Sequence, residues 1–167
     1  MAFLGDVEMK EKTKERLEKE FLALPLHHID TSILLEVENT ENGRFCQRYL
    51  QKIGSKYRGS ISLPVIGEVL LNILSLKTIH EKYVLLEIAD SLISIRKIKF
   101  YIPLDISETL TKIKSLDSRI EPTDAMIFAC AVEDNVNTLV TLDKNLIHNE
   151  KLEKEFGIKI KHPRELL

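Results

Sequence analysis

Four acidic residues occupy similar positions in this sequence, each beside an apolar stretch that can form a strand or a helix. They are Asp30, Glu68, Asp124 and Asp143. Ionised carboxylates gather at one place in a fold only at a cost in free energy, because like charges repel and burial adds a desolvation penalty. A bound divalent cation offsets both effects, and carboxylate oxygens are ligands that Mg²⁺ and Mn²⁺ prefer. The four acids are therefore candidate metal ligands if the fold brings them together.

Two of these acids follow stretches that are expected to be buried strands. Residues 26–29 are predicted to form a short strand that runs directly into Asp30. Residues 137–142 consist mainly of β-branched and apolar residues, which is typical of a central parallel strand, and Asp143 follows them. Ligands of parallel α/β folds bind beyond the carboxyl ends of the strands. Asp30 and Asp143 are therefore predicted to lie at the same edge of a sheet.

The other two acids lie near the starts of predicted helices. Pro64 fits the first turn of a helix that carries Glu68 one turn further along. Pro122 opens an almost wholly apolar helix whose first turn contains Asp124, where the positive end of the helix dipole tolerates an acid. A helix that follows a strand begins at the carboxyl edge of the sheet, so these placements would bring all four acids to one rim.

Strands and helices alternate along the chain, which predicts right-handed β–α–β crossovers and an α/β fold with a parallel sheet covered on both sides. Residues 54–60 are expected to form a turn. Several later acids, Asp117 and Asp134 among them, are interpreted as surface charge. The expected strands span residues 26–29, 61–63, 97–104, 137–142 and 157–161, and the expected helices begin near residue 32 or span residues 42–53, 64–74, 78–96, 107–116 and 122–132.

Residues 1–25 are predicted to form a helical extension of a single domain that spans residues 26–167. A charged helix is expected over about residues 8–21, amphipathic only in its last turns, and Pro25 ends it. A helix that packs on the domain or on a partner, including a second copy in a homodimer, and a frayed tail are both compatible with this stretch.

The overall composition excludes several classes of protein. With 167 residues, 44% of them hydrophobic and 30% charged, the chain is typical of a globular protein. A net charge of −2 argues against coating nucleic acid through bulk charge, but it is compatible with a local basic groove. The sequence shows no apolar run of transmembrane length and no signal-peptide core, so a cytoplasmic location and no membrane partner are expected. Cys46 and Cys130 fit no zinc-ligand spacing.

The segments that carry the four acids occur together in the order and at the spacings of a known family. Through IDTSILL, IGEVL, TDAMIFACA and LVTLDKNL, residues 26–167 resemble the PIN domain, a metal-dependent nuclease fold that includes the VapC-type toxins. The resemblance implies a three-layer α/β/α architecture with a central parallel sheet. It also implies that the four acids bind one or two Mg²⁺ or Mn²⁺ ions, and that the chain is an endoribonuclease with RNA as its substrate.

Three polar residues are predicted to support the acids. Thr141 matches the polar position that the family commonly has before its last acid, and its hydroxyl would orient a carboxylate. Ser32 lies close to Asp30 and would act in the same way. Asn72 lies four residues after Glu68 on the same helical face, where it would hold that acid, reach the substrate or simply face water.

Basic residues recur every four positions in the expected helix over residues 42–53 and continue beyond it. Such a stripe of basic side chains would bind RNA phosphates, and each contact would add salt-dependent affinity. A solvated helix face is the commoner meaning of a charge run. The candidate RNA contacts are Arg44, Arg48, Lys52 and Arg58.

Simpler explanations exist for each acid taken alone: helix caps at Asp30 and Asp143, a first-turn acid at Asp124, and a solvated helical residue at Glu68. Two other classes of function are alternatives to a nuclease. A catalytically silent PIN-like module that binds RNA or protein is disfavoured because all four acids are present. A receiver-type phosphoacceptor domain is disfavoured because Asp30 stands alone and HPRE follows the last strand. An active enzyme would be a toxin paired with an antitoxin protein, or an RNA-processing nuclease.

Overall fold

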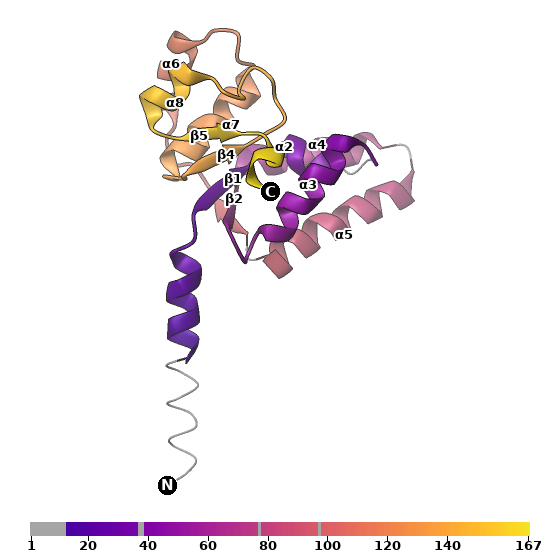
Figure 1. The fold of residues 1–167 in the computed structure, drawn as a ribbon. Helices are drawn as coiled ribbons and strands as arrows, with labels where there is room; N and C mark the ends of the chain where they lie inside the picture. Colours follow the sequence, from indigo (N-terminus) through magenta and orange to yellow (C-terminus); the bar gives the residue numbers. More distant parts are fainter. Residues whose placement is uncertain (1–12, 37–38, 77, 97) are drawn as a thin grey trace.

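A parallel sheet of five strands forms the centre of the protein (Figure 1). The computed structural model describes residues 13–36, 39–76, 78–96 and 98–167. The strand order is β3-β2-β1-β4-β5, and every neighbouring pair is parallel. The strands are β1 (Leu26–Ile29), β2 (Arg58–Ser62), β3 (Lys99–Tyr101), β4 (Thr138–Val140) and β5 (Lys159–Lys161).

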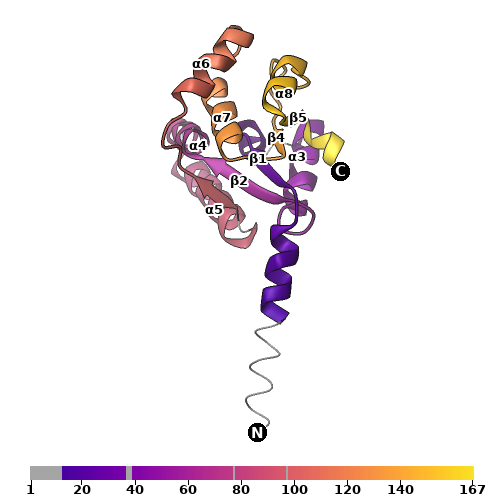
Figure 2. The same ribbon diagram turned by 90° about the vertical axis from the view of Figure 1, so that its left-hand side faces the viewer.

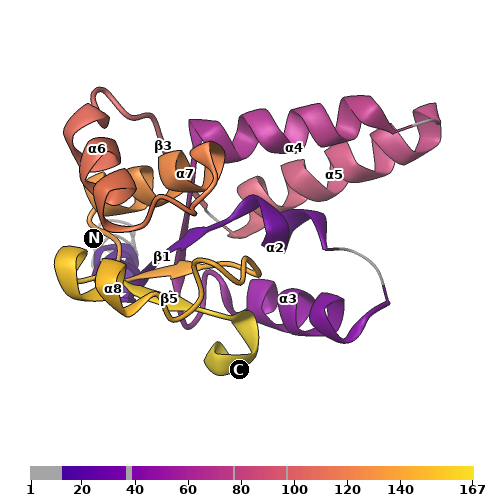
Figure 3. The ribbon, with the colours of Figure 1, turned by 90° about the horizontal axis from the view of Figure 1, so that it is seen from above.

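Helices cover both faces of this sheet, which confirms the predicted three-layer α/β/α class. Helices α2, α3, α4 and α5 lie on one side of the strands, and α6, α7 and α8 lie on the other (Figures 1 and 3). This arrangement follows from right-handed crossovers, because the chain moves across the sheet in opposite directions before β3 and after it. The helices are α2 (Thr31–Leu35), α3 (Glu41–Lys52), α4 (Leu63–Ser75), α5 (Ile79–Arg96), α6 (Ser107–Leu116), α7 (Pro122–Glu133), α8 (Glu150–Phe156) and the 3-10 helix η1 (Pro163–Leu166).

The core is densely packed where β2 approaches its neighbours. Gly59 of β2 has room for no side chain, because an added Cβ would lie 3.0 Å from Ile29 Cδ1 and 3.1 Å from atoms of Ile53 and Ile98. On the opposite side of the sheet, α7 is buried along most of its length. Its nearly continuous apolar sequence therefore reflects a helix enclosed by protein rather than an amphipathic surface helix.

One element differs from the sequence prediction. Residues 58–60 were expected in a turn, but they begin β2. Ser60 is fully buried, and its hydroxyl donates a hydrogen bond of 2.5 Å to Asp134 Oδ2. Small polar residues that suggest a turn are compatible with a central strand when an acid that is distant in the sequence accepts their hydrogen bonds.

Two acids that were interpreted as surface charge are in fact buried. Asp134 forms an ion pair with Lys99 in addition to its bond from Ser60. Asp117 accepts hydrogen bonds from Arg119 Nε at 2.9 Å and from Arg119 Nη2 at 2.8 Å. Both carboxylates are tolerated inside the protein because each is paired and hydrogen-bonded.

The N-terminal helix projects from the domain (Figures 1 and 2). It covers residues 13–22, and the earlier part of the expected helix, residues 8–12, lies outside the described residues. Arg58 joins the following segment to the sheet, with its Nε donating to Leu24 O at 3.1 Å and its backbone N–H to Pro25 O at 2.9 Å. None of the described helices has the length and apolar character that crossing a membrane requires.

Candidate active site

Two of the acids lie at the carboxyl edge of the sheet, where the strand order reverses. Asp30 directly follows β1, and Asp143 lies three residues after the end of β4. These strands are neighbours, with Ile29 opposite Val140. The chain continues from β1 toward β3 in one direction and from β4 toward β5 in the other, so this edge is the topological switch point at which α/β proteins bind ligands.

Asp124 lies in the first turn of α7, and its pKa is raised in part by the other three acids. Burial is the largest cause that raises this pKa, and the negative charges of Asp143, Asp30 and Glu68 follow, so that the value moves from 3.8 to about 6. The four carboxylates therefore act on one another across a shared space. A cation placed there would relieve this accumulated negative charge.

Two hydroxyl groups fix the orientation of Asp30. Ser32 Oγ and Thr141 Oγ1 both donate to Asp30 Oδ2, at 2.5 and 2.7 Å. Thr141 Oγ1 in turn accepts the backbone N–H of Asp143 at 3.0 Å, and Ser32 Oγ accepts that of Leu142 at 3.0 Å. Each hydroxyl thus joins the first acid to the loop that carries the last one.

The carboxylates of Glu68 and Asp143 are held by other partners. Thr31 Oγ1 donates to Glu68 Oε2 at 2.6 Å. Asp143 Oδ1 accepts the backbone N–H groups of Asn145 and Leu146 at 2.8 and 2.9 Å. Thr31 is not among the residues predicted from the sequence, where its only signal is its position directly after Asp30.

Asn72 is bound to the main chain of Glu68 and not to its carboxylate. Its Nδ2 donates to the main-chain oxygen of Glu68 at 2.8 Å, one helical turn earlier, and its side chain is exposed. The structure therefore gives Asn72 a hydrogen bond within α4 and no bond to the Glu68 carboxylate.

The candidate RNA contacts are spread between the carboxyl edge and the amino edge of the sheet. Helix α3 runs back to β2, so Arg44, near its start, lies closer to the acidic edge than Lys52 at its end. Lys52 Nζ donates to Leu166 O at 3.1 Å. Arg58, the first residue of β2, lies at the amino edge of the sheet, opposite the acids.

The donor set suits a hard divalent cation, but it is not assembled around one. Among the described residues, no three His, Cys, Asp or Glu side chains already stand in an arrangement that holds a metal ion. All four groups nevertheless offer oxygen atoms, and the pKa of Asp124 is raised by burial and, in addition, by the charges of the other three. This chemistry favours Mg²⁺ or Mn²⁺ over a soft metal, and binding requires the carboxylates to turn toward a common point.

The fold and the acidic edge together define an α/β protein with a carboxylate site at its switch point. The model of the PIN domain family matches residues 28–152, a range that contains all four acids. The chain belongs to the PIN domain family. None of the curated proteins matches it.

Solved structures with the same fold come from several bacteria. VapBC2 from Rickettsia felis, bound to a promoter DNA fragment, has a TM-score of 0.62 at 17% identity, over 82% of this chain and 98% of that chain. FitAcB from Neisseria gonorrhoeae has a TM-score of 0.62 at 18% identity, over 83% and 98%. VapBC-5 from Mycobacterium tuberculosis, of the VapBC family of toxin–antitoxin systems, has a TM-score of 0.59 at 12% identity, over 83% and 98%.

Proposed function

We propose that this protein is a metal-dependent endoribonuclease that hydrolyses RNA phosphodiester bonds at the carboxyl edge of its sheet. The observation that carries the proposal is the clustering of Asp30, Glu68, Asp124 and Asp143, close enough for three of them to raise the pKa of the fourth. Membership of the PIN family, whose members are generally nucleases, supports the same conclusion.

The residues of this chain would hold and orient the metal ligands. Thr141 and Ser32 hold the Asp30 carboxylate through Oδ2, and Thr31 holds that of Glu68 through Oε2. One or two Mg²⁺ or Mn²⁺ ions bound by the four carboxylates would supply an activated water and offset the charge that develops on the scissile phosphate. Such chemistry needs no His or Cys nucleophile.

The first experiment measures cleavage of labelled single-stranded and structured RNAs with Mn²⁺, with Mg²⁺ and with a chelator. It compares the wild type with Asp30→Asn and Asp124→Asn, and uses Asp90→Asn, an exposed acid of α5, as the matched control. We expect metal-dependent cleavage by the wild type and the control, and activity at the chelator level for the two site variants.

A second measurement makes the result independent of turnover. Mn²⁺ stabilises any protein that binds it only in the folded state, so it should raise the Tm of the wild type more than that of Asp124→Asn. Equal cleavage by all four proteins would indicate a contaminant and contradict the proposal. Metal binding without cleavage would favour the silent PIN-like module that binds RNA or protein.

We further propose that the nuclease is a toxin controlled by a small antitoxin protein. One structural relative belongs to a toxin–antitoxin family. An apolar surface of the kind that marks protein interfaces is uncovered on α4 and α5 of the single chain. Its exposed residues are Leu70, Leu71, Leu74, Ile79 and Tyr83.

This role is tested with the product of the neighbouring reading frame. Co-expression of that protein with the wild type should give a stable complex that inhibits cleavage, and Leu71→Glu with Leu74→Glu should weaken it. A catalytically active chain that forms no such complex would instead be an RNA-processing nuclease.

A further inference from the structure

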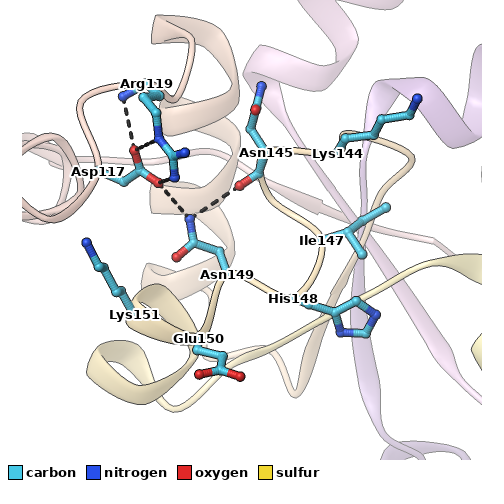
Figure 4. A pocket seen from close by; sticks show the side chains of 9 residues that line it. All are labelled: Asp117, Arg119, Lys144, Asn145, Ile147, His148, Asn149, Glu150 and Lys151. Carbon is cyan, nitrogen blue, oxygen red and sulfur yellow. Dashed lines mark hydrogen bonds and ion pairs between the residues drawn. The ribbon is translucent and has the colours of Figure 1, made fainter.

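A polar cavity lies beside the acidic cluster, between the turn from α6 to α7 and the loop that follows β4 (Figure 4). Its volume is about 380 Å³, and its walls come from residues 117–119 and 144–151. Nearly all of its lining side chains are charged or carry an amide or imidazole group. Such a lining suits a polar ligand.

Both walls of the cavity lead directly into the acidic cluster. The loop wall begins at Lys144, directly after Asp143, and the carboxylate of Asp143 accepts the backbone N–H of Asn145 at 2.8 Å. The other wall leads into α7, whose Asp124 lies five residues after Arg119. A strand of nucleic acid that crossed the acidic site would therefore continue into the cavity.

A side chain from each wall fixes the shape of the cavity. Asn149 Nδ2 donates to Asp117 Oδ2 at 3.1 Å, which connects the two walls, and to Asn145 O at 3.3 Å within its own wall (Figure 4). Hydrogen bonds from Arg119 hold the pKa of Asp117 well below its usual range. Asp117 therefore remains charged, and it anchors Arg119 at the rim, where the Arg119 side chain is 77% exposed.

The cavity also carries two lysines without an ion pair among the described residues. Lys144 and Lys151 are exposed and form no ion pair with any residue that the structure describes. Arg119 is paired with Asp117, and Glu150 also lines the cavity, so the lining holds three cations and two carboxylates and keeps a small positive excess next to the acidic cluster. A chain of phosphates that passed the acidic site would meet its counter-charge here.

The size of the cavity sets the scale of the ligand. Small-molecule sites span about 300–1,000 Å³, so this cavity suits one nucleotide rather than a stretch of duplex. Proteins recognise single-stranded RNA through phosphate contacts and hydrogen bonds to splayed bases. Lysines for the phosphates and the side-chain amide of Asn145 for the base or ribose fit that pattern.

We propose that this cavity is a substrate subsite, which receives the nucleotide next to the scissile phosphate of a single-stranded RNA. Lys144 and Lys151 contact its phosphates, and Arg119 closes the rim. The subsite rests on the proposed nuclease function for its position relative to the reaction, but RNA binding to it is measurable without turnover.

The test measures binding of a labelled single-stranded RNA of mixed sequence by fluorescence anisotropy, in chelator and at several salt concentrations. The variant is Lys144→Gln with Lys151→Gln. The matched control is Lys154→Gln with Lys19→Gln, which removes two exposed charges elsewhere, one of them on the same helix. We expect the affinity of the pocket variant to fall roughly tenfold and its salt slope to become shallower by about 1.4, because each phosphate contact on a single strand contributes about 0.7. The control should bind like the wild type.

The possible outcomes distinguish failure of the subsite proposal from failure of the nuclease proposal. Equal loss of affinity in the pocket variant and the control overturns the subsite, and so does a wild type that binds no RNA. If the wild type cleaves RNA in a metal-dependent manner while the pocket variant keeps its affinity and KM, the subsite fails and the nuclease stands. If the pocket variant alone loses affinity but no protein cleaves RNA, the cavity is an RNA-binding site and the nuclease proposal fails.

Discussion

At the scale of single residues, hydroxyl groups organise the acidic site. Thr141 donates to Asp30 and accepts from the backbone of Asp143, so one side chain couples two candidate ligands on neighbouring strand ends. Side chains that orient metal ligands commonly change metal affinity or activity by about 10–100-fold when they are lost. The hydroxyls are therefore as open to testing as the acids themselves.

Thr141→Val is expected to lower Mn²⁺ affinity and cleavage by about 10–100-fold, because Asp30 loses a donor and the N–H of Asp143 loses its acceptor. The fold should survive with a loss of about 1–3 kcal/mol, the cost of an unsatisfied buried group. Calorimetric metal titration and urea unfolding measure the two effects. Thr138→Val, at a buried threonine of β4 without a side-chain hydrogen bond in the described structure, should leave metal affinity unchanged. Equal metal affinity in both variants would rule out the orienting role.

Asp124 gives the metal-free protein a distinctive dependence on pH. Its folded pKa of about 6 lies above the ordinary value of 3.8, so the folded state holds this proton more tightly than the unfolded chain does. The contribution of Asp124 to the free energy of unfolding is therefore lost as pH rises from about 4 through 6. The loss should be on the order of 1–2 kcal/mol, after allowance for the partial exposure of the side chain.

The difference between the wild type and Asp124→Asn isolates this effect. His27 and His28 act in the opposite sense, because burial lowers both pKa values to about 4, so stability is lost as pH falls from 6.5. Both proteins contain these histidines. Urea unfolding at pH 4.5 and 7 should show that Asp124→Asn gains stability relative to the wild type as pH rises. Addition of Mn²⁺ at pH 7 should reduce this difference in the free energy of unfolding, because the metal stabilises the wild type. Identical pH profiles would show that the acids do not interact.

The sequence predicts the four acids, Thr141 and Ser32 because each lies at a recognisable place relative to a strand or helix. It does not predict that Thr31 binds Glu68, since a threonine at a helix start has many possible partners. Nor does it predict that Asp134 is buried. The reason is the bond from Ser60, 74 residues away in the chain, and no local pattern encodes such a contact.

At the scale of elements, local patterns predict the parts that are buried on one or both faces. The apolar run of α7 and the alternation of strands with helices are enough to predict the layers. The start of β2 is different, because its residues Arg58, Gly59 and Ser60 are those that normally indicate a turn. They form a strand because Gly59 fits beneath packed isoleucines and Ser60 has a buried acceptor.

Two glycines should respond to alanine with opposite signs. Gly59→Ala would place its Cβ 3.0–3.1 Å from three isoleucine side chains, so overpacking should destabilise the domain by about 1–3 kcal/mol. Gly67→Ala, in α4, meets nothing within 4 Å and should stabilise the domain by about 0.5–1 kcal/mol, since it restricts the unfolded chain. Urea unfolding of the two variants checks the signs. A stabilising Gly59→Ala would show that β2 is packed more loosely than described.

At the scale of the whole molecule, the two ends of the sheet have different tasks. The acids and the polar cavity lie at the carboxyl edge, and the N-terminal helix joins the domain at the amino edge, just before β1. The N-terminal helix can therefore change without moving the candidate catalytic groups. The sequence indicates a helical extension but not its direction, because that direction depends on bonds such as the one between Arg58 and Leu24 O.

Deletion of residues 1–24 should lower the assembly state of the protein and leave metal binding intact. The helical residues 13–22 project from the domain and expose Leu17 and Leu22, so packing against a second copy of the chain is expected to cover them. Light scattering should show fewer chains per particle after truncation. Leu17→Glu with Leu22→Glu should have the same effect in the full chain. Mn²⁺ affinity should not change, because the acids lie at the opposite edge of the sheet. An unchanged number of chains per particle would mean that the helix does not mediate assembly, whereas a loss of Mn²⁺ affinity would show that the two edges are coupled.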